Sequence, residues 1–82
     1  MSKTKVRNNI RRLRFDSNEM TQKQLAEKVG VTRQTIVAIE RAKYAPSLEL
    51  AFEISRVFDK PLEEVFTFDT TPVMAPALQQ VV

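Results

Sequence analysis

The chain has 82 residues, of which 43% are hydrophobic, and it contains neither cysteine nor histidine. This length predicts one small domain, and the apolar fraction is sufficient for a hydrophobic core. The composition excludes disulfides, Cys/His zinc sites and histidine-dependent catalysis, so we expect no cofactor or metal and no enzyme activity. No segment resembles a secretory signal or a membrane span, which leads us to expect a cytoplasmic protein without membrane contact.

The net charge of +3 conceals an asymmetry along the chain. The part up to Tyr44 carries eleven basic and four acidic residues, whereas the part from Ala45 onward carries two basic and six acidic residues. Basic surfaces attract polyanions, and charges that only hydrate a surface need not segregate in this way. The first part is therefore the candidate for contact with nucleic acid.

The N-terminal residues predict an arm followed by a helix. Residues 1–7 are basic and indicate either an extended arm or a short strand. Asn8 or Asn9 can cap the helix that follows, in which Ile10 and Leu13 lie at helical spacing.

Two short helices on either side of the only glycine form the centre of the chain. Thr21 and Gln24 have the spacing of a capping box, and Gly30 suits the left-handed position that commonly follows a helix. Thr32 is the expected N-cap of the second helix, Arg33–Arg41. The inward apolar side chains are Leu25, Ala26, Val29, Ile36 and Ile39. A helix, a glycine turn and a second capped helix are the layout of a helix-turn-helix.

Two further helices and a tail complete the sequence. Ser47 is the expected N-cap of the first, and Asp59 is among the residues that accept a left-handed position after a helix. Pro61 favours the start of a last short helix, Leu62–Phe66. Residues 69–82 have no helical period and predict a flexible tail, with contact to a partner as the alternative.

The central unit resembles the Cro and phage-repressor-like (XRE-type) helix-turn-helix regulators. The resemblance covers roughly Val6 to Phe68, and it rests on Gln22, Leu25-Ala26, Val29-Gly30-Val31, Arg33-Gln34-Thr35-Ile36, Ile39, Glu40 and Lys43-Tyr44-Ala45-Pro46-Ser47-Leu48. It implies an all-α, compact five-helix lambda-repressor-like DNA-binding domain over residues 8–68. It also suggests a β-ribbon that joins Lys3–Arg7 to Phe66–Phe68, with a minor-groove arm as the alternative. Two departures are a longer loop without glycine at residues 15–19, and Ala42 at a turn position.

The resemblance implies that the second helix of the unit enters the major groove of double-stranded DNA. The expected base-contacting residues, opposite the inward face, are Thr32, Arg33, Gln34, Val37 and Ala38. Arg33 suits guanine and Gln34 suits adenine, although Arg33 could contact a phosphate instead. The expected phosphate contacts are Gln22, Thr35, Arg41, Lys43 and Tyr44. The family also implies an ion pair between Arg14 and Glu40.

A module of this size normally binds a palindromic operator as a homodimer. The candidate interface residues are Leu62, Val65, Phe66 and Phe68, which could instead only close the monomer core. The function expected is sequence-specific transcriptional regulation, with repression favoured and no small-molecule ligand. The alternatives are an antitoxin that holds its toxin through the tail, and a protein-interaction module without specific DNA readout.

Overall fold

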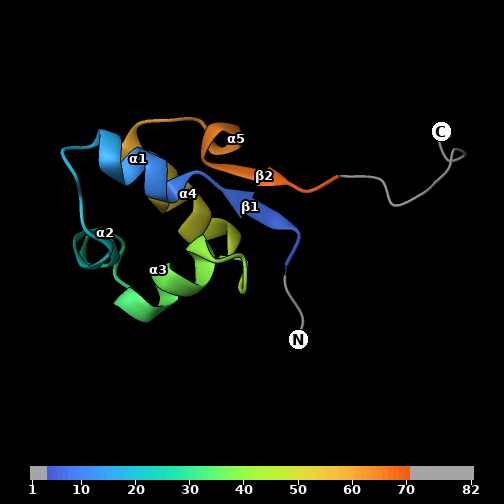
Figure 1. The fold of residues 1–82 in the computed structure, drawn as a ribbon, viewed down its shortest axis with the longest axis horizontal. Coiled ribbons are helices and arrows are strands. Elements are labelled where there is room, and N and C mark those ends of the chain that lie inside the picture. Colours follow the sequence, from blue (N-terminus) through green and yellow to red (C-terminus); the bar gives the residue numbers. More distant parts are fainter. Residues whose placement is uncertain (1–3, 71–82) are drawn as a thin grey trace, which may run out of the picture.

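The computed structural model describes residues 4–70, which form five helices and a two-stranded antiparallel sheet (Figure 1). In chain order the elements are β1 Val6–Asn8, α1 Ile10–Asp16, α2 Gln22–Val29, α3 Arg33–Glu40, α4 Leu48–Phe58, α5 Leu62–Val65 and β2 Phe66–Phe68. This confirms the predicted five-helix fold. Residues 1–3 and 71–82 lie outside the described part, and with them most of the predicted tail and the partner contact suggested for it.

The two strands join the ends of the domain. Val6 lies opposite Phe68 and Asn8 lies opposite Phe66, so the ribbon closes α5 against the start of α1. Arg7 adds an ion pair of 3.1 Å with Asp69 at the outer end of the ribbon. Of the alternatives for the basic arm, the short strand is the one observed for residues 6–8.

Side-chain caps set the starts of three helices, as the sequence predicts. At α2 the Gln24 amide donates to Thr21 Oγ1 (2.9 Å) and the Thr21 amide donates to Gln24 Oε1 (2.8 Å), a complete capping box. The amide of Thr35 donates to Thr32 Oγ1 at α3, and Ser47 caps α4 in the same way. These bonds satisfy amides that the first turn of a helix leaves without partners.

Residues with a left-handed backbone conformation form the turns between the helices. Gly30 has φ +75° after α2 and Asp59 has φ +56° after α4, both as predicted. Ala42 also adopts φ +59° after α3, although its Cβ makes this conformation costly. The loop before α2 contains two consecutive left-handed residues, Asn18 and Glu19, which accommodate its extra length without a glycine.

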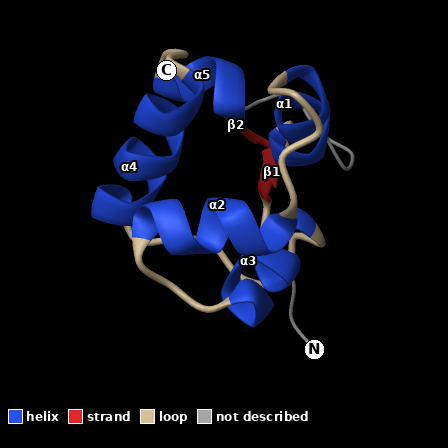
Figure 2. Ribbon diagram, turned by 90° about the vertical axis from the view of Figure 1, so that its left-hand side faces the viewer, coloured by secondary structure: helices blue, strands red, loops and turns tan. Residues whose placement is uncertain are grey.

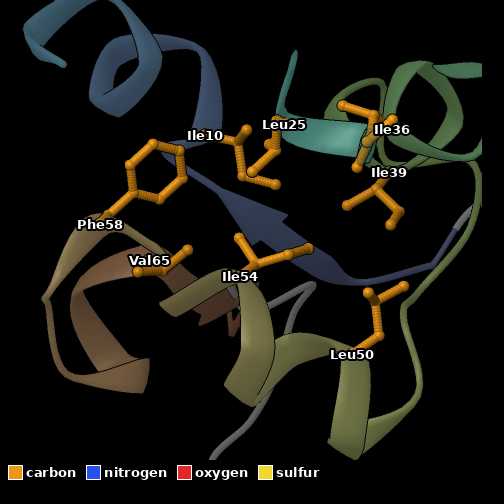
Figure 3. Packing of buried hydrophobic residues seen from close by; sticks show 9 residues of the cluster. Ile10, Leu25, Ile36, Ile39, Leu50, Ile54, Phe58 and Val65 are labelled. Atoms are coloured by element: carbon orange, nitrogen blue, oxygen red, sulfur yellow. The ribbon is translucent and has the colours of Figure 1, made fainter. Parts of the chain in front are cut away.

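The core draws side chains from all five helices (Figure 3). Its fully buried members are Ile10, Leu25, Ile36, Ile39, Ile54 and Val65. Val65 was a candidate for the dimer interface, but its side chain has no exposed surface in the monomer. Of the two alternatives, the structure shows the core position for Val65. Leu62 and Phe66 are half-buried, while Phe68 is 62% exposed, so these three keep surface for a partner. No helix within residues 4–70 is long and apolar enough to cross a membrane.

Candidate nucleic-acid interface

Helices α2 and α3 lie side by side at one end of the molecule, α4 packs against α2, and α1 and α5 lie toward the opposite end (Figure 2). Ala26 is 2% exposed, and its small side chain lets the two helices approach closely. The Val31 amide donates to the Ala26 carbonyl (3.0 Å), which closes the turn through Gly30. This geometry turns one face of α3 inward and the opposite face toward solvent.

The outer face of α3 holds the side chains expected to read bases. Arg33 and Gln34 in the first turn are exposed, and Val37 and Ala38 follow as half-buried residues. Thr32 is exposed, but its hydroxyl already accepts from the Thr35 amide and lies 3.1 Å from the Thr35 hydroxyl. The most accessible groups for base edges are therefore the guanidinium of Arg33 and the amide of Gln34.

A nearly buried ion pair holds the end of α3. Arg14 Nε donates to Glu40 Oε2 (2.7 Å), and the second guanidinium nitrogen donates to Glu40 Oε1 (3.1 Å). Their side chains are only 14% and 9% exposed. Arg14 also donates to the Met20 carbonyl (2.9 Å), and Gln22 Nε2 donates to Glu40 Oε1 (3.1 Å). One carboxylate thus joins α1, the first residue of α2 and the last residue of α3.

The start of α2 has the features of a phosphate site. The backbone amides of Gln22 and Lys23 have no hydrogen-bond partner among residues 4–70, and they lie at the positive end of the helix dipole. The Gln22 side chain donates to Glu40 through only one of its two N–H groups, so one remains for a phosphate oxygen.

The other expected phosphate contacts differ in their surroundings. Arg41 and Lys43 are exposed and have no ion-pair partner within the described residues, and Tyr44 is 48% exposed. Thr35 is half-buried, and its hydroxyl is within hydrogen-bond distance of that of Thr32. Arg41, Lys43 and Tyr44 follow the end of α3, so they suit the sugar-phosphate backbone beside the groove that α3 would occupy.

A hollow of about 1220 Å³ lies beside this surface, between α1, the start of α2 and α3. Gln22, Arg33 and Arg41 line it, together with two residues that sequence reasoning missed, Arg11 and Arg12 on α1. They were missed because α1 precedes the helix-turn-helix motif. The signal in the sequence that could have identified them is that the two arginines are adjacent. Across residues 4–70, no group of three or more acidic side chains is placed to hold a metal ion.

Two capped helices around a glycine turn, with an exposed polar face and a basic margin, define a helix-turn-helix DNA-binding domain. The family model described as Helix-turn-helix matches residues 10–65, more than half of the chain. The chain therefore belongs to the XRE-type helix-turn-helix family, as predicted, and is a DNA-binding transcriptional regulator.

Similar proteins agree with this assignment. An HTH-type transcriptional regulator of Archaeoglobus fulgidus is 50% identical over 64 residues, which cover 78% of this chain and 89% of that protein. The HTH-type transcriptional regulator YgzD of Bacillus subtilis is 44% identical over 61 residues, covering 74% and 91%. A crystal structure of a proposed DNA-binding protein from Bacteroides fragilis has the same fold, with a TM-score of 0.66 at 21% identity, covering 76% of this chain and 98% of that one.

Proposed function

We propose that the protein is a sequence-specific repressor that binds a palindromic operator as a homodimer, with α3 in the major groove of each half-site. The observation that carries this proposal is the first turn of α3, where Arg33 and Gln34 are exposed and Arg33 has no partner among residues 4–70. The guanidinium can donate two hydrogen bonds to guanine, and the Gln34 amide can pair with adenine.

The surrounding groups support binding in one register. The start of α2 has free amides and the residues after α3 include exposed cations; Gln22, Lys23 and Arg41 line the same hollow as Arg33. Phosphate contacts of this kind fix the position of a protein on the duplex and leave sequence reading to the recognition helix. In this proposal, Val37 and Ala38 complete the reading by contact with thymine methyl groups.

A dimer is proposed because one such helix reads only a few base pairs. Leu62, Phe66 and Phe68 are adjacent along α5 and β2, and their remaining exposed apolar surface is the proposed interface. Binding of a dimer at the operator would repress by competing with other proteins for the same DNA.

Selection of bound duplexes from a random pool tests the proposal, followed by titration of the selected duplex and of a scrambled one. We expect the selected duplex to be palindromic. Arg33→Ala should weaken binding to the selected duplex by about 1–3 kcal/mol, the value of one bidentate base contact, with a smaller effect on scrambled DNA. Arg56→Ala, at an exposed arginine of α4, is the matched control. Equal losses of affinity for both duplexes would make Arg33 a phosphate contact. If no sequence is enriched from the pool, sequence-specific binding is wrong.

A further inference from the structure

We propose that the DNA-binding surface extends onto α1, where Arg11 and Arg12 contact the sugar-phosphate backbone that passes over the start of α2. This inference rests on the proposed DNA binding, and it adds a phosphate site outside the helix-turn-helix motif. The predicted phosphate contacts from the sequence contain no residue of α1.

The shape of the surface is the first argument. The hollow beside α3 has α1 as one wall, with Arg11 and Arg12, and the other walls carry Lys23, Arg33 and Arg41. A DNA strand that contacts the start of α2 while α3 lies in the major groove runs along this hollow. Arg33 belongs both to the hollow and to the first turn of α3, and Arg41 lines the hollow directly after the end of α3, so the two surfaces are continuous.

The charge of the hollow is the second argument. Arg11 and Arg12 are exposed, and neither has an ion-pair or hydrogen-bond partner for its side chain among residues 4–70. Two acidic residues line the hollow, and one of them, Glu40, is already paired with Arg14. Glu19 alone remains against the free cations, which leaves a strong excess of positive charge.

The spread of the cations around the hollow favours a polyanion as its occupant. A single phosphate would fill only a small part of about 1220 Å³, and it could not reach cations on three separate helices. A DNA strand carries one charge per roughly 3.4 Å of the helix axis, so it can meet several dispersed cations at once. The apolar side chain of Phe15, 67% exposed on the same wall, can pack against a sugar between them.

The test compares the salt dependence of binding to the selected duplex. Each phosphate contact contributes about 0.9 to the slope of log K against log salt concentration. The variant Arg11→Gln/Arg12→Gln should therefore lower the slope by about 1.8, so that its affinity loss between 50 and 200 mM salt is about tenfold smaller than that of the wild type. Arg56→Gln/Lys60→Gln removes the same net charge at exposed sites outside the hollow, and should leave the slope close to that of the wild type.

A charge-preserving variant separates contact from folding. Arg11→Lys/Arg12→Lys should keep most of the slope, because lysine also binds phosphate as a point charge. Equal slopes for the glutamine variant and the control variant would overturn the inference, as would loss of the slope in the lysine variant. If the wild type selects an operator and the glutamine variant keeps its slope, only this inference fails. If the wild type selects no operator, the proposed function is wrong, and this inference is wrong with it.

Discussion

Replacing Arg14 with methionine is the sharpest test of how the DNA-facing helices are held together. The change keeps the aliphatic volume of the side chain but removes both hydrogen bonds to Glu40 and one to the Met20 carbonyl. The Glu40 side chain, 9% exposed, then keeps Gln22 as its remaining partner. Breaking one side of a buried ion pair costs about 3–5 kcal/mol, and the residual exposure here favours the lower end, about 3 kcal/mol.

Urea unfolding followed by circular dichroism measures this cost. Small domains lose roughly 1 kcal/mol of stability per molar urea, so the midpoint should fall by about 3 M, or the variant should be unfolded without urea. The matched control is Arg7→Met, because the Arg7–Asp69 pair is 46% and 32% exposed. Its loss should be about 1 kcal/mol or less. If Arg14→Met costs no more than Arg7→Met, the assignment of a structural role to the buried pair is wrong.

Two other predictions concern the turn after α3 and the dimer. Ala42→Gly should raise the free energy of unfolding by about 0.5–1 kcal/mol, since relief of the left-handed alanine exceeds the entropic cost of glycine; a lower urea midpoint would contradict this. Leu62→Glu should give monomers in sedimentation velocity, because it places a charge in the proposed apolar interface, and a retained dimer would move that interface elsewhere.

The features that the sequence predicts correctly are those encoded within a few residues. The caps at Thr21, Thr32 and Ser47 each depend on a side chain and an amide three residues later. Gly30 is similarly local, because its left-handed conformation needs only the absence of a Cβ. The Arg14–Glu40 contact spans 26 residues and came from the family resemblance rather than from any pattern in the chain.

Features that depend on how the helices pack were not predictable in the same way. Asn8 and Asn9 were the two possible caps for α1. Asn9 occupies the N-cap position without a side-chain capping bond, and Asn8 has two roles. Its Oδ1 accepts from the Ile10 amide (3.1 Å), and its Nδ2 donates to the Ile39 carbonyl (2.8 Å), at the end of α3. Val65 carries no sequence signal that separates a core position from an interface position. Only the spatial arrangement of α1, the start of α2 and α3 around one hollow shows that Arg11 joins the basic surface.

The buried pair also explains how separate helices can act on DNA as one surface. A buried ion pair is weak evidence for stability, since apolar side chains of similar size can replace it with little loss. Glu40, however, also holds the side chain of Gln22 at the start of α2. A preorganised contact avoids the entropic cost of fixing a side chain on binding.

The double variant Arg14→Met/Glu40→Leu should therefore recover most of the stability lost by Arg14→Met and yet bind the operator more weakly, because Gln22 is no longer held. One net hydrogen bond is worth about 0.5–1.5 kcal/mol, so the loss should reach up to about tenfold. Gln22→Ala should produce a similar loss in the wild type and almost none in the double variant, since coupled residues are not additive. Additive losses would show that Glu40 stabilises the fold without positioning Gln22 for DNA.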